Sequence, residues 1–179
     1  RLAAAAKRRR STAASNSDGS AADGAAGSSL PARFSVEHQA LRLLIHRPDA
    51  LAAWLDPVLF IDPVNEAAFC ALTEVGELHE ARAMVDDEAA DLLGRLAVDD
   101  ATDDDPNGVL CRLLALAAER TAVELEAQAR GSGDLENYQP SIAFLRRGVI
   151  DLRESVTDLA QVKPLLQWLI EYNDRGADG

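Results

Sequence analysis

Six apolar residues toward the end of the chain are separated by alternating intervals of three and four: Ile142, Leu145, Val149, Leu152, Val156 and Leu159. This spacing is typical of a helix whose apolar side packs along a second helix at a shallow crossing angle. An earlier stripe within residues 107–130 contains Leu110, Leu113, Leu114, Ala117, Thr121 and Leu125. The segment 131–134, Gly-Ser-Gly-Asp, separates the two stripes, so we predict an antiparallel helical hairpin.

Shorter helices are predicted before this hairpin. The chain has 33 alanines and 25 leucines but only 16 valines and isoleucines together, which favours helices over strands. We expect a helix over 36–47 capped by Ser35, a short helix opening at Pro48, a helix from Pro63 that stops at Gly76, and helices over 78–85 and 87–97.

The predicted fold class is all-α, with a compact bundle of short helices followed by a long helix and a C-terminal helical hairpin. A terminal helix restarts at Lys163-Pro164. The predicted units are a flexible, disordered N-terminal tail (1–33), the bundle (34–105) and the long helix with the hairpin (106–179). Residues 11–29 contain only Ser, Thr, Ala, Asn, Asp and Gly, which cannot form a core.

The charge of the chain is divided unevenly. Residues 34–179 carry 12 basic and 28 acidic side chains, a net charge of −16, so this part should repel nucleic acid. The basic run Lys7–Arg10 has three interpretations: the end of an upstream domain, a weak nucleic-acid contact, or solvated charge. Because the chain begins with Arg1 and not Met, we expect that it is a fragment of a longer protein.

The two cysteines and the hydropathy pattern point to a reducing, aqueous compartment. Cys70 and Cys111 both lie in apolar helical segments, so we predict two buried thiols in a cytoplasmic protein and no disulfide. No apolar run approaches the roughly 20 residues that span a bilayer, and the N-terminus does not resemble a signal peptide. We therefore expect no membrane association.

One segment partly matches a calcium-binding loop. Residues 103–108 read Asp-Asp-Asp-Pro-Asn-Gly, which fits the opening of such a loop, but its twelfth position holds Leu114 where a bidentate glutamate is needed. The favoured interpretation is an acidic turn that leads into a helix.

No group of residues indicates a metal centre or a catalytic site. His79-Glu80 begins like a zinc-protease motif, but position 83 is alanine, and His38 and His46 lack an obvious third ligand. The acidic residues Glu119, Glu124 and Glu126 are expected on the solvent side of the long helix. We therefore predict no catalytic residue, no metal and no cofactor in this chain.

The stretch from Leu41 to Leu51, Leu-Arg-Leu-Leu-Ile-His-Arg-Pro-Asp-Ala-Leu, resembles the opening of a known family. The C-terminal helicase-binding domain of bacterial DNA primase starts with a Leu-rich helix, a short polar pair, proline, an acid and a second apolar helix. Phe60, the helix predicted at 63–75, and the order of bundle, long helix and terminal hairpin continue the likeness. The resemblance covers about residues 34–174.

This resemblance implies a recruiting domain of the bacterial replisome and not an enzyme. Primer synthesis would belong to upstream zinc-binding and polymerase domains of the full-length primase, where zinc and magnesium are expected. The terminal hairpin would dock on the N-terminal domain of the hexameric replicative helicase. The candidate docking residues are Arg146, Arg147, Gln167, Trp168 and Tyr172, although Trp168 fits a core position equally well.

A second partner is considered within this interpretation, and two alternative functions stay open beside it. In some members of the family a basic pocket on the bundle holds the acidic tail of single-strand-binding protein; the candidates here are Arg33, Arg42 and Arg47, and the acidic segment 99–105 would oppose that contact. An unrelated acidic helical regulator would sequester a partner, or dimerise through residues 142–159. A nucleic-acid binder would act through Lys7–Arg10.

Overall fold

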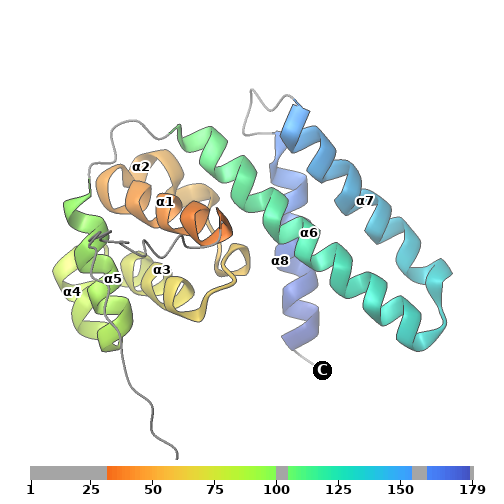
Figure 1. Ribbon diagram of the computed structural model, residues 1–179, viewed down its shortest axis with the longest axis horizontal. Coiled ribbons are helices and arrows are strands. Elements are labelled where there is room, and N and C mark those ends of the chain that lie inside the picture. Colours follow the sequence, from red (N-terminus) through yellow and green to blue (C-terminus); the bar gives the residue numbers. More distant parts are fainter. Residues whose placement is uncertain (1–31, 100–104, 155–160, 178–179) are drawn as a thin grey trace, which may run out of the picture.

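The computed structural model describes residues 32–99, 105–154 and 161–177, which form helices and no strands (Figure 1). The elements are α1 (Ala32–His46), α2 (Pro48–Leu51), the 3-10 helices η1 (Ala52–Trp54) and η2 (Pro57–Leu59), α3 (Pro63–Val75), α4 (Leu78–Met84), α5 (Asp87–Val98), α6 (Pro106–Ser132), α7 (Leu135–Glu154) and α8 (Lys163–Ala177). The predicted all-α class is confirmed. The predicted tail lies outside the described residues, apart from its last two positions, which belong to α1.

Several helix boundaries follow from local capping. Aspartate side chains cap α3, α5 and α6: Asp62, Asp86 and Asp105 each accept a backbone N–H from the first turn that has no helical partner. Gly76 and Gly133 end α3 and α6 with φ angles of 75° and 71°, a left-handed conformation that glycine adopts without steric strain.

The bundle of short helices contains a buried carboxylate. Glu37 on α1 is only 2% exposed, and its oxygens accept the backbone N–H of Ile61 at 3.0 Å and the Asn65 side-chain amide at 2.6 Å. The Asp62 N–H lies 3.5 Å from the same carboxylate. Because these donors lie at the start of α3, Glu37 fixes that helix against α1.

Helix α6 joins the two halves of the molecule. It packs on α1 in the bundle and on α7 and α8 in the C-terminal part (Figure 1). Arg120, near its middle, donates to the backbone oxygens of Val58 at 2.6 Å and Phe60 at 3.5 Å, next to η2. The whole predicted stripe of α6 is buried: Leu110, Leu113, Leu114, Ala117, Thr121 and Leu125.

The C-terminal helices pack around α6. Helix α7 folds back along α6, with Ile142, Leu145 and Val149 buried as the spacing predicts, and Leu152 half-buried. Val156 and Leu159, the remaining members of the predicted seam, lie outside the described residues. Helix α8 crosses α6 and also contacts η2 (Figure 1). None of the described helices combines the length and the apolar character needed to cross a membrane.

Two local predictions were wrong. Helix α1 begins at Ala32, so Ser35 lies inside the helix and is not its N-cap. Cys70 is exposed, whereas Cys111 is buried as expected. The inward face of α3 is formed by Asn65, Ala68, Phe69 and Leu72, and a residue one position after Phe69 is turned about 100° away from that face.

Candidate protein-binding surface

Helices α7 and α8 approach each other closely at Gly148. A Cβ atom at this position would lie 3.0 Å from Cδ2 and 3.1 Å from Cδ1 of Leu165, closer than ordinary van der Waals contact. Leu165 itself is buried, so it has little room to move away. The absence of a side chain at Gly148 therefore lets the start of α8 approach α7 closely at this point.

Three aromatic rings form a continuous cluster on this surface. Trp168 stacks on Tyr172 with ring centroids 5.3 Å apart and an interplanar angle of 6°, and Phe144 tilts against Trp168 at 5.9 Å. The Tyr172 hydroxyl accepts a hydrogen bond from the Gln128 amide of α6 at 3.2 Å. Phe144 is 39% exposed, while Trp168 and Tyr172 are half-buried. Such a cluster offers large, rigid contact area, which is typical of binding hot spots.

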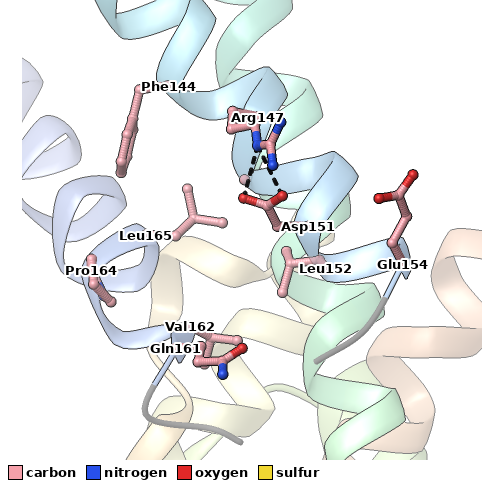
Figure 2. A pocket seen from close by; sticks show the side chains of 10 residues that line it. Phe144, Arg147, Asp151, Leu152, Glu154, Gln161, Val162, Pro164 and Leu165 are labelled. Carbon is pink, nitrogen blue, oxygen red and sulfur yellow. Dashed lines mark hydrogen bonds and ion pairs between the residues drawn. The ribbon is translucent and has the colours of Figure 1, made fainter. Parts of the chain in front are cut away.

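A pocket of about 420 Å³ lies beside this cluster, between α7 and the start of α8. Figure 2 shows Leu165, Val162 and Leu152 facing the pocket, and Phe144 and Pro164 at its edge. The other lining residues bring polar groups to the rim: Arg147, Asp151, Glu154 and Gln161. The pocket therefore combines an apolar floor with a charged rim.

Most of the polar side chains near the cluster are already held within their own helix. On α7, Arg147 Nε lies 2.9 Å from Oδ1 of Asp151 and donates to Oδ2 at 3.2 Å. On α8, Glu171 accepts from Gln167 at 3.3 Å and forms an ion pair with Arg175 at 3.8 Å. Because these groups are held in place, a partner would order few additional side chains on binding.

A separate surface lies between α6 and α7. Arg146 pairs with Glu126 and Arg153 pairs with Glu119. Between these pairs, Val123 and Ile150 are 61% and 47% exposed and line a groove of about 470 Å³. Glu124 is exposed, as expected, while Glu119 and Glu126 are partly exposed and pair with arginines of α7.

The structure divides the predicted helicase-docking residues between these two surfaces. Arg147, Gln167, Trp168 and Tyr172 belong to α7 and α8 around the aromatic cluster, whereas Arg146 belongs to the groove between α6 and α7. Phe144 was missed by the sequence analysis. Its sequence position could have indicated an exposed contact residue, because Phe144 is a large apolar residue that precedes Leu145 and does not belong to the buried seam.

The two arginines predicted for a second partner whose side chains the structure describes, Arg42 and Arg47, differ in exposure. Arg42 is half-buried on α1, and Arg47 is exposed just after α1 ends. The Arg33 side chain lies outside what the structure describes. The contact with a single-strand-binding protein stays a prediction.

The residues weighed for metal binding have structural contacts. Asp105 caps α6 through the N–H groups of Asn107 and Gly108, while residues 103 and 104 lie outside the described part. The His46 ring nitrogen Nε2 lies 3.1 Å from the carbonyl oxygen of Leu96, which links α1 to α5. Within the described residues, no group of three or more His, Cys, Asp or Glu side chains is arranged to hold a metal ion.

Burial perturbs the pKa of three side chains outside the aromatic surface. Burial and the nearby Arg95 lower the pKa of His38. Partial desolvation raises the pKa of Cys70, although its side chain is exposed overall, and burial raises the pKa of Cys111; neighbouring carboxylates add to both effects. Neither thiol is therefore activated as a nucleophile.

Comparison of the chain with protein-family models, with curated proteins and with solved structures gives no match.

Proposed function

We propose that this chain is the helicase-docking domain of a bacterial DNA primase. In this proposal, α7 and α8 bind the N-terminal domain of the hexameric replicative helicase and so recruit the primer-synthesising enzyme to the replication fork. The chain itself performs no chemistry. Tethering a polymerase beside its template raises the effective concentration of the enzyme without any new catalytic group.

The observation that carries this proposal is the aromatic cluster of Phe144, Trp168 and Tyr172 beside an open pocket. The order of the elements also supports it, because a bundle of short helices is followed by a long helix and a helical hairpin, as the resemblance implies. The stretch from Leu41 to Leu51 forms the end of α1 and all of α2. Arg47 separates these two helices and Pro48 opens α2, at the position where the resemblance places a polar pair followed by a proline.

The groove between α6 and α7 favours a second candidate function. An acidic helical regulator would use the exposed side chains of Val123 and Ile150 to bind a partner or a second copy of itself. Dimerisation through the predicted seam would require the hairpin to open, because Ile142, Leu145 and Val149 already pack inside the chain. A dimer in analytical ultracentrifugation that Ile150→Ser dissociates would favour this candidate.

Calorimetry with the N-terminal domain of a bacterial replicative helicase tests the primase proposal. We expect binding by the unmodified chain and a loss of about 10-fold or more with Phe144→Ala, as for truncation of an interface anchor worth about 1.4 kcal/mol or more. Val98→Ala is the matched control, because Val98 is an exposed apolar residue on α5. No binding by the unmodified chain, or equal losses in both variants, would refute the proposal.

A further inference from the structure

We infer that the pocket between α7 and α8 receives one cationic side chain, arginine or lysine, from a helix of the docked partner. This inference deepens the proposed function, since it assigns a chemical anchor and a docking face to the same surface. It depends on three properties of the pocket: its shape, its charge and its aromatic edge.

The shape of the pocket suits a single long side chain. Its volume of about 420 Å³ has room for a long side chain, and its floor is formed by Leu165 and Val162, which are 5% and 2% exposed, and by half-buried Leu152. Figure 2 shows Leu165 and Leu152 on either side of the pocket, with Val162 and Gln161 at its lower end. Arginine and lysine have long hydrocarbon stems that pack on apolar surfaces while their charge stays near water.

The charge of the rim selects against an acidic side chain. Arg147 is held by Asp151, so these two charges offset each other. Glu154, also at the rim, forms no hydrogen bond or ion pair with the part of the chain that the structure describes. Among the rim residues that the structure describes, Glu154 therefore keeps one negative charge for a partner, within a chain whose net charge is −12. An apolar side chain would cover the Glu154 carboxylate without compensating its lost hydration.

The aromatic edge adds a second attraction for a cation. Phe144 lines the pocket and also contacts Trp168, so one ring belongs to both the pocket and the aromatic cluster. A guanidinium or ammonium group over an aromatic ring is attracted to its negative face. A single partner helix would therefore place its cation in the pocket and an apolar residue on the aromatic cluster, as in helix-in-groove recognition.

A titration with a small probe tests the pocket independently of any helicase. N-acetyl-arginine amide is added to the full chain while methyl resonances are followed by NMR. We expect shifts at Leu152 and Leu165, and a probe affinity about two- to fivefold weaker in Glu154→Gln, as expected for an exposed ion pair worth up to about 1 kcal/mol. Glu124→Gln is the control, because it removes an equal charge from an exposed site on α6 outside the pocket.

The outcomes separate this inference from the proposed function. Equal shifts with N-acetyl-leucine amide, no shifts with the arginine probe, or equal affinities in the two glutamine variants would overturn the cation pocket. Calorimetry with the helicase domain then tests the larger proposal. Suppose that the helicase domain binds the chain, but that Glu154→Gln changes neither the affinity of this complex nor the salt dependence of that affinity. The docking proposal is then supported, and the inference that the pocket binds a cationic side chain is refuted. If the arginine probe binds and the helicase domain does not, the cation-binding pocket is supported and the primase proposal is refuted.

Discussion

Replacing Glu37 tests whether a buried carboxylate holds α3 against α1. Glu37→Leu replaces the carboxylate with an apolar side chain of moderate size, which fills the space in the bundle but offers no acceptor oxygens. The Ile61 N–H and the Asn65 amide, at 3.0 Å and 2.6 Å in the native protein, would then lose their partner. Each buried donor without an acceptor costs about 1–3 kcal/mol, for a total of about 2–6 kcal/mol.

Two effects modify this estimate. Removing the carboxylate also removes the cost of burying a charge, which offsets part of the loss. The contact from the Asp62 N–H is 3.5 Å long and adds little. We therefore expect Glu37→Leu to lower the free energy of unfolding by about 2–4 kcal/mol. Glu37→Gln keeps one acceptor oxygen, so it should lose about half as much.

Urea unfolding followed by far-UV circular dichroism measures the loss of unfolding free energy in Glu37→Leu and in Glu37→Gln. The comparison requires that the slope of this free energy with urea concentration be the same in all variants. Glu124→Gln, an exposed substitution on α6, should remain within about 0.5 kcal/mol of the unmodified protein. Asn65→Leu combined with Glu37→Leu should cost less than the two separate losses added together, because the residues share one interaction. A loss below about 0.5 kcal/mol in Glu37→Leu would refute the reasoning, since a buried donor without an acceptor costs at least about 1 kcal/mol.

Two further predictions follow from the perturbed pKa values. The pKa of His38 is lowered in the folded state by burial and Arg95, so unfolding takes up a proton and stability should fall as pH decreases below about 6.5, the ordinary histidine value. His38→Gln should weaken this pH dependence, measured as urea midpoints between pH 7 and pH 5; an unchanged dependence would contradict the assignment. Cys70 should react with a thiol reagent in the folded protein, at a rate that rises only toward alkaline pH because the thiolate is the nucleophile and the pKa of Cys70 is raised, whereas Cys111 should react only after unfolding. Two thiols that react equally fast without denaturant would show that Cys111 is not protected.

Features that depend on local spacing were predicted from the sequence. The heptad interval placed Leu145 correctly in the interior of the hairpin, and the pairing of Asp62 with Pro63 located the start of α3. Both features depend only on residues close together in one helix. The 3.6-residue period determines which side chains share a face, and a capping side chain determines where the first turn begins. The i, i+4 spacing likewise put Trp168 and Tyr172 on one face of α8.

Features that depend on distant parts of the chain were not predicted. Nothing near Glu37 shows that it is buried, because its partners Ile61 and Asn65 lie 24 and 28 residues away. The contribution of Phe144 to the aromatic cluster depends in the same way on how α7 and α8 meet on α6. The contact between Gly148 and Leu165 allows that meeting, and neither residue belongs to a motif that indicates it.

The role of α6 in both halves of the molecule limits which changes in length the protein tolerates. Its 27 residues extend about 40 Å, with α1 packed on one part and α7 on another. Inserting one residue near its middle would rotate one end by about 100° relative to the other and shift it by about 1.5 Å. The apolar stripe of α6 that faces α1 and the stripe that faces α7 could then not both stay in contact with their partner helices. The turn at Gly133, which lies after the helix, carries no such constraint, so length variation between homologous chains should collect there and not in α6.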